Sequence, residues 1–141
     1  MAGIIALIAY ESGGFVYDTN QQGTAGQGTR NMQMVNWNWL YATSISALKT
    51  QAEAIVTSAA AASAATTAQK NAIRALVLPD EYSWASGAWF YSTQCGAAAK
   101  AALQAGGTAG WTAYMACVGV DPTEAQRLAY YTAAQKAFGL L

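Results

Sequence analysis

A stretch of glycine and small polar residues, from 13 to 28, interrupts a chain that otherwise carries helical signals along its length. The apolar residues before it, 2–12, predict a helix that stops at a Gly-Gly pair. Three further glycines within the stretch predict turns at short spacing. The pattern therefore predicts an all-α fold, α+β at most, with one small glycine-rich loop or hairpin after the first helix.

Apolar residues at three- and four-residue spacing predict helices through the rest of the chain. We expect one domain spanning 1–141 with a single core, because 141 residues leave room for little else. The expected helices cover 44–78, 80–95 and 96–105, and a break in the first of these near 66–67 is left open. A fourth helix is expected with Thr108 as its cap. The last helix is expected to start at Asp121, with Pro122 in its first turn.

The sequence contains no histidine, and its seven Lys and Arg balance seven Asp and Glu. The lack of histidine excludes Ser-His-Asp triads, Cys-His dyads and His-ligated zinc or haem. Sparse positive charge argues against a nucleic-acid partner, which depends on Lys and Arg meeting phosphates. No apolar run reaches the roughly 18–20 residues of a membrane span. We therefore expect no metal, no organic cofactor and no membrane insertion, with acid–base chemistry resting on carboxylates, tyrosines or lysines.

Two cysteines, Cys95 and Cys117, leave two readings open. They are either free buried thiols or one disulfide, whose loop closure would contribute about 3 kcal/mol. The apolar residues 3–9 lack the basic leader of a signal peptide, so we expect them to belong to the mature fold. We also expect that an upstream leader was removed or never included.

Glu11 has the best placement for chemistry. It falls at the end of an apolar helix, where burial and the negative end of the helix dipole both raise the pKa of a carboxyl group. Asp18 follows on a polar loop, where we expect it to remain ionised. Two carboxyl groups with separated pKa values are typical of enzymes that cleave glycosidic bonds. Spacing alone also leaves a structural interpretation open. In that interpretation, Glu11 is a solvated charge at the end of the helix and Asp18 is a residue that forms a turn.

Residues 5–15, IALIAYESGGF, resemble the I-A-x-x-E-S-G-F motif of goose-type lysozymes and lytic transglycosylases. The glutamate of that motif is the catalytic acid, which implies this role for Glu11. Residues 28–34, GTRNMQM, resemble the second motif of the same enzymes, G-x-M-Q followed by an apolar residue, which lines the substrate groove. The two motifs occur in the order that these enzymes share.

The chain is still more similar to small secreted fungal proteins with a lysozyme-like fold. It carries their ESGGF, GQGTRNMQM and PDEYSW segments, and a WF pair followed by TQC that ends at Cys95. The resemblance covers nearly the whole chain. It implies a lysozyme-like fold, secretion and a disulfide between Cys95 and Cys117.

The resemblance implies an extracellular, antimicrobial muramidase that hydrolyses β-1,4 links between N-acetylated amino sugars, with peptidoglycan as the favoured polysaccharide partner. We expect a monomer in which Glu11 protonates the leaving oxygen and Asp18 positions water or stabilises developing positive charge. The candidate substrate contacts are Gln33, Asn31, Thr29, Trp37 and Tyr82.

Three alternative functions stay open: a lytic transglycosylase, a chitin- or chitosan-cleaving enzyme, and a catalytically silent secreted carbohydrate-binding protein.

The remaining tryptophans and one arginine are expected to have structural or groove positions. We expect Trp84, Trp89 and Trp111 in the core. Trp39 is a further candidate for the groove wall, and Arg30 is expected to pair with a nearby carboxylate.

Overall fold

The computed structural model describes all 141 residues and contains ten helices. They are α1 (Ala2–Glu11), α2 (Val35–Ser44), α3 (Ser46–Ile55), α4 (Ala59–Ala64), α5 (Thr67–Val77), α6 (Asp80–Ser83), α7 (Ser86–Gln94), α8 (Ala97–Ala105), α9 (Gly107–Val118) and α10 (Ala125–Ala137). Extended pairing is limited to two isolated β-bridges, Thr19 with Gly28 and Gly28 with Gln33. The all-α prediction is confirmed. No helix combines the length and the apolar character that crossing a membrane requires.

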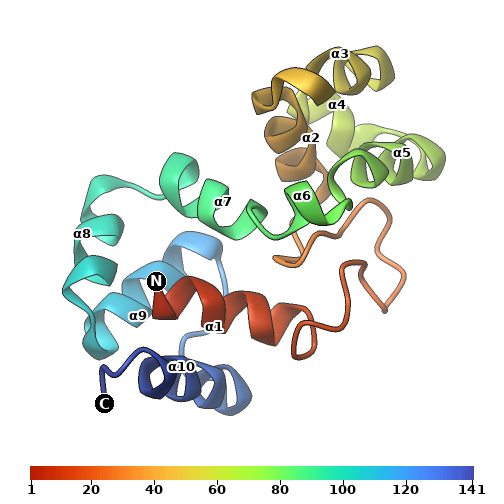
Figure 1. Ribbon diagram of the computed structural model, residues 1–141. Coiled ribbons are helices and arrows are strands. Elements are labelled where there is room, and N and C mark those ends of the chain that lie inside the picture. The colour runs from red at the N-terminus through yellow and green to blue at the C-terminus, as the bar shows by residue number, and fades with distance from the viewer.

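The helices form two lobes joined by the loop 12–34 and by the segment from α6 to α7 (Figure 1). One lobe packs α1 against α10 and α8 against α9, around the buried side chains of Leu7, Trp111 and Tyr114. The other lobe packs α2 against α3, α4 and α5. Its buried residues form two smaller clusters, centred on Tyr41 and Ile73. The apolar interior is therefore divided, whereas a single core was expected.

The expected helix over 44–78 is three helices in the structure. The chain is extended at Val56, and the Ser58 side chain then caps α4 by accepting a hydrogen bond from the Ala61 amide. Thr66 and Gln69 form a capping box at the start of α5, which confirms the break near 66–67. The alanine-rich run favours helix, but Ser and Thr side chains stabilise new helix starts within it.

Three other boundaries differ from the prediction. α9 begins at Gly107 after Gly106, so Thr108 lies inside the helix and is not its cap. The expected helix over 80–95 divides into α6 and α7. The last helix begins at Ala125, because the Glu124 carboxylate accepts hydrogen bonds from the amides of Gln126 and Arg127. Asp121 bonds instead to the amide and hydroxyl of Thr123, which closes a turn ahead of the helix.

The glycine-rich loop folds back against α5 in the lobe of α2–α5. At Gly28, a Cβ atom would lie 2.7 Å from Arg74 Cδ and 2.8 Å from the Asp18 carbonyl oxygen, so a larger residue cannot fit. The amide of Gly26 donates to the Asn71 side chain on α5. These contacts fix the loop, which leads directly from the end of α1 to α2.

The structure shows the positions of the cysteines, of Arg30 and of three tryptophans for which expectations follow from the sequence. Cys95, just after α7, forms a disulfide with Cys117 in α9, as the resemblance implied. Arg30 pairs with Asp80 at 3.4 Å, which confirms a carboxylate partner. Trp111 is buried and Trp89 packs against the core. Trp84 is 42% exposed, so its expected core position is wrong.

Candidate active site between the lobes

Glu11 is the last residue of α1, and the chain turns sharply just after it. The hydroxyl of Ser12 donates to the Ile8 carbonyl and accepts a hydrogen bond from the Phe15 amide, which satisfies groups at the helix end. The next two glycines have φ values of +62° and +75°, a region that other residues rarely adopt. This turn ends the helix at the carboxyl group and sends the chain into the loop.

Two adjoining cavities share the Glu11 side chain. The first, of about 190 Å³, lies between the lobes and is lined mainly by apolar side chains. The second, of about 370 Å³, is polar and is bordered by Tyr17, Asn20 and Thr24 of the loop. Gln27 and Met32 also border both cavities. Glu11 is the one carboxylate that lines either, so it faces a continuous groove rather than bulk solvent.

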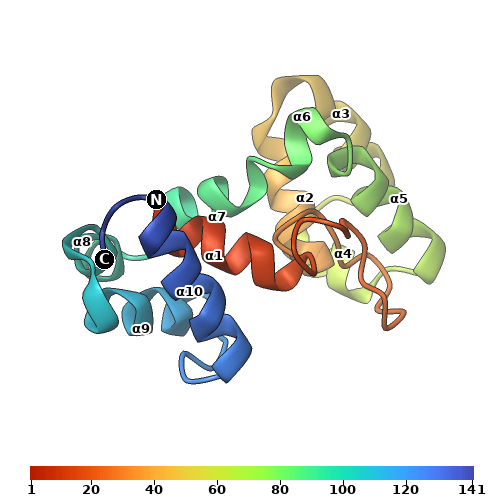
Figure 2. The same ribbon diagram turned by 60° about the horizontal axis from the view of Figure 1, so that its bottom comes forward.

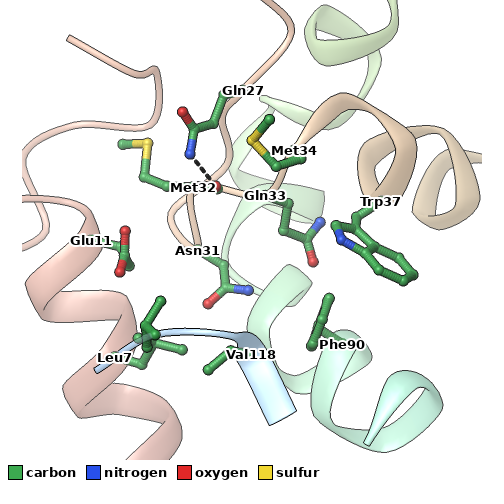
Figure 3. A pocket seen from close by; sticks show the side chains of 11 residues that line it. Leu7, Glu11, Gln27, Asn31, Met32, Gln33, Met34, Trp37, Phe90 and Val118 are labelled. Atoms are coloured by element: carbon green, nitrogen blue, oxygen red, sulfur yellow. Dashed lines mark hydrogen bonds between the residues drawn. The ribbon is translucent and has the colours of Figure 1, made fainter. Parts of the chain in front are cut away.

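Two amide side chains line the first cavity together with Glu11, Asn31 nearer to Glu11 and Gln33 nearer to Trp37 (Figure 3). Asn31 and Gln33 are both more than nine-tenths buried, and their carbonyl oxygens accept no hydrogen bond. Gln33 is oriented through its Nε2, which donates to Oδ1 of Asn38. The Asn38 amide in turn donates to the carbonyls of Gly26 and Gln33. Buried acceptors without donors are costly, and they suit a ligand that brings N–H or O–H groups.

The pKa of Glu11 is raised above its ordinary value, and partial burial is the main cause. The guanidinium of Arg127 opposes this shift, because its Nη2 lies 3.6 Å from Oε1 of Glu11 and favours the charged form. The raised pKa lets the carboxyl group retain a proton to a higher pH than an exposed glutamate would. It can therefore act as a general acid.

Arg127 is buried and held on several sides. Its Nη1 donates to the Asp121 carbonyl at 2.7 Å, and its guanidinium lies 4.2 Å from the centre of the Tyr10 ring. α10 thus presents a fixed cation behind the carboxyl group at the end of α1. The residues around Arg127 in the sequence do not indicate this role. The contact between α1 and α10 is too distant in sequence for any local pattern to indicate it.

The structure places only some of the expected substrate-binding residues in the groove. Asn31, Gln33 and Trp37 line the first cavity, where the Trp37 ring meets Phe90 edge-on. Thr29 is fully buried and packs its hydroxyl 2.9 Å from that of Ser86, so its expected contact with substrate is replaced by a structural role. The φ of Thr29 is +66°, a strained value beside the groove.

Three other candidates lie outside both cavities. Asp18 accepts a hydrogen bond from its neighbour Thr19 and borders neither cavity, so the fold does not place it with Glu11 along the groove. Tyr82 lines neither cavity, and its backbone carbonyl accepts a hydrogen bond from the Tyr41 hydroxyl. The indole N–H of Trp39 donates to the carbonyls of Ala52 and Val56, which makes it a structural residue.

Apolar groove residues come from parts of the chain that carry no motif. Leu7 on α1 and Val118 at the end of α9 lie at the bottom of the cavity as drawn in Figure 3, and Val120 also lines it. A further cavity, of about 420 Å³, lies where the two chain ends meet and has no carboxylate in its wall. No cluster of three His, Cys, Asp or Glu side chains is arranged to hold a metal ion.

Comparison with known proteins gives one informative similarity. A bifunctional dioxygenase (DOX)-epoxy alcohol synthase (EAS) of Fusarium oxysporum (strain Fo5176), named as an enzyme, is 37% identical to this chain over 142 residues. The alignment covers 99% of this chain and 11% of the Fusarium protein, so the chain corresponds to a small segment of it. No protein-family model matches the chain, and no solved structure matches it.

Proposed function

We propose that the protein is a glycoside hydrolase of the muramidase type, which cleaves β-1,4 links between N-acetylated amino sugars in peptidoglycan. The observation that carries the proposal is the position of Glu11. Its carboxyl group has a raised pKa and borders both cavities of the groove. A groove that continues on either side of an acid suits a polymer cleaved within its chain.

In the proposed reaction, Glu11 gives its proton to the glycosidic oxygen as the bond from that oxygen to C1 breaks. A water molecule then supplies hydroxide to C1, and its other proton returns to Glu11. Partial burial favours the neutral acid before the reaction, while Arg127 stabilises the carboxylate after proton transfer.

The lining of the first cavity supports an N-acetylated substrate. The carbonyl oxygens of Asn31 and Gln33 would accept the N–H of an acetamido group or a sugar hydroxyl. The methyl of that acetamido group would pack against the nearby rings of Trp37 and Phe90. A hydrophobic pocket with a few polar groups is the usual composition of a specific ligand site.

A lytic transglycosylase is the second candidate, because a single carboxylate lines the groove. Such an enzyme closes C1 on the sugar's own C6 hydroxyl and leaves an anhydro-muramic end, so it needs no second carboxylate to position water. Hydrolysis with Asp18 as the second carboxylate requires movement of the loop that bears it.

Secretion also belongs to the proposal, and the Cys95–Cys117 disulfide supports it because disulfides persist in oxidising compartments. The activities in the name of the Fusarium protein are not transferred to this chain. The match covers 11% of that protein, so those activities belong to a protein of which this chain resembles one small segment.

Product analysis tests the proposal. Purified peptidoglycan is digested and its fragments are identified by mass spectrometry, beside digests of pure chitooligosaccharides. Muramic reducing ends support the hydrolase, and anhydro-muramic ends support the transglycosylase. Cleavage of chitooligosaccharides alone would contradict the peptidoglycan assignment. Release of no fragment from any substrate at any pH would contradict the enzyme assignment and favour a binding protein.

A further inference from the structure

Two aromatic side chains stand exposed beside one another on the surface next to the groove. Phe15, in the turn after α1, is 41% exposed, and Trp84, just after α6, is 42% exposed. Their ring centres are 5.8 Å apart and the ring planes are inclined by 41°. Neither residue lines the two cavities of the groove. We call this pair the Phe15–Trp84 platform.

A network of polar contacts holds the platform in place. The Arg30 guanidinium lies 4.7 Å from the Trp84 ring centre, and its Nη1 donates to the carbonyl oxygens of Phe15 and Val16. The indole N–H of Trp84 donates to Asp80, which also pairs with Arg30. The exposed rings are therefore pre-positioned, and a ligand that binds them pays little to order them.

The backbone at Phe15 is strained. Its φ is +70°, a region in which a bulky residue is an outlier. Ser12 and Arg30 fix the turn through hydrogen bonds to the amide and the carbonyl of Phe15. A strained residue that the surroundings hold in place, with its apolar ring in water, indicates a function rather than a contribution to stability.

The loop that carries Phe15 also supplies a wall of the groove. Tyr17, two residues after Phe15, is exposed and borders the polar cavity that Glu11 shares. The Tyr17 ring packs over Gly13, since a Cβ at that glycine would lie 3.0 Å from the ring. One short segment of chain therefore contributes an aromatic side chain to the groove and another to the platform.

We propose that the Phe15–Trp84 platform is a binding site for an N-acetylated amino-sugar strand that extends out of the groove. Sugar rings present C–H faces that stack on aromatic rings, and the pre-positioned pair offers two such faces. Arg30 and Asp80, the charged residues that contact Trp84, pair with each other, so the site suits an uncharged ligand rather than nucleic acid. The inference rests on the proposed function for the identity of the sugar, but the site itself requires no catalysis.

Sedimentation with insoluble polymer tests the platform without relying on turnover. The Glu11→Gln protein, which should bind without cleaving, is mixed with purified peptidoglycan and separately with chitin, and the unbound fraction is measured. Trp84→Ala and Phe15→Ala, each in the Glu11→Gln background, should bind about tenfold more weakly to the polymer that the Glu11→Gln protein binds. Trp84→Tyr should retain most of the binding. In otherwise wild-type protein, the two alanine variants should still cleave short soluble oligosaccharides that end within the groove.

Phe138→Ala is the matched control, because Phe138 is an exposed phenylalanine that follows α10. The C-terminal end of α10 lies at the opposite side of the molecule from the loop 12–34 in Figure 2. Near-ultraviolet circular dichroism establishes that each variant is folded. Equal polymer binding by the alanine variants and the Glu11→Gln protein would overturn the proposal, as would an absence of binding by the Glu11→Gln protein to both polymers. A concentration-dependent dimer that Trp84→Ala abolishes would also overturn it. Polymer binding through the platform without cleavage by the wild-type protein would support the site while contradicting the proposed enzyme function.

Discussion

Arg127 Nη2 on the last helix lies 3.6 Å from Oε1 of Glu11 at the end of the first helix. Two influences shift the pKa of the Glu11 carboxyl group in opposite directions. Burial of Glu11 raises the pKa of its carboxyl group, and the Arg127 charge lowers it. The range of pH over which Glu11 stays protonated is thus set by two elements at opposite ends of the sequence.

Removal of the Arg127 charge should shift the pH dependence of activity. In Arg127→Met the pKa of Glu11 rises, because the lowering influence is lost while burial remains. The active form is the protonated acid, so activity is lost as pH rises through this pKa. The basic limb of the profile of kcat/KM against pH should therefore move to higher pH in the variant.

Arg127→Lys keeps a positive charge and should move the basic limb less than Arg127→Met does. Lys136→Met removes an exposed charge from the same helix and should leave the limb in place. An unchanged limb in Arg127→Met, with the variant folded, would show that Arg127 does not act on the group whose proton limits the rate.

The buried amide of Asn31 should determine the preference for N-acetylated sugars. Asn31→Leu keeps the volume but removes the acceptor, and should raise KM for an N-acetylated substrate roughly fivefold to tenfold with kcat little changed. Steady-state kinetics on acetylated and deacetylated oligosaccharides measure this change. Asn36→Leu, on α2 outside both cavities, is the control. An equal rise in KM for both substrates would argue against recognition of the acetyl group.

The Asn38 side chain should both stabilise the protein and orient the Gln33 side chain in the groove. Asn38→Leu leaves the Gly26 carbonyl without its side-chain donor and the Gln33 Nε2 without its acceptor, while the Gln33 carbonyl keeps only the Gly28 amide. Unfolding in urea should show a loss of about 2–5 kcal/mol in the free energy of unfolding. KM should also rise, because Gln33 loses its orienting partner. Stability equal to that of the wild type would contradict this role for the Asn38 amide.

The disulfide should contribute about 3 kcal/mol to the free energy of unfolding. Cys95→Ala with Cys117→Ala removes both thiols of the chain, so denaturant unfolding reports the bridge without side reactions. Val118 follows Cys117 and lines the groove, so KM should rise in the same variant. Wild-type protein kept under reducing conditions should match the double variant. A loss of less than about 1 kcal/mol in the free energy of unfolding would show that the packing of α7 and α9 stabilises the protein without the disulfide.

The sequence carried enough information to predict the elements that local chemistry determines. The end of α1 at Glu11, the break before α5 and the pairing of Arg30 with a carboxylate all depend on nearby residues or on one strong electrostatic preference. The start of α10 was predicted wrongly, because aspartate is a preferred cap residue and glutamate is not. In the structure Asp121 closes a turn with Thr123, and the Glu124 carboxylate accepts from the amides of Gln126 and Arg127.

Features that depend on packing between distant segments could not be predicted from local patterns. Thr29 has a polar side chain beside a motif, but the contact with Ser86 buries it. Trp84 has the apolar bulk of a core residue, but Arg30 and Asp80 hold it at the surface. The position of Arg127 behind Glu11 follows from the packing of α10 on α1, which no motif records.

The rate of glycan cleavage by Glu11→Gln tests the account most directly. Release of reducing or anhydro ends from purified peptidoglycan is measured for the wild type, for Glu11→Gln and for the matched control Glu53→Gln, an exposed glutamate on α3. The account predicts that Glu11→Gln folds normally, still binds the polymer and cleaves it roughly 100- to 10,000-fold more slowly, while Glu53→Gln cleaves at the wild-type rate. A folded Glu11→Gln protein that cleaves peptidoglycan as fast as the wild type would contradict it.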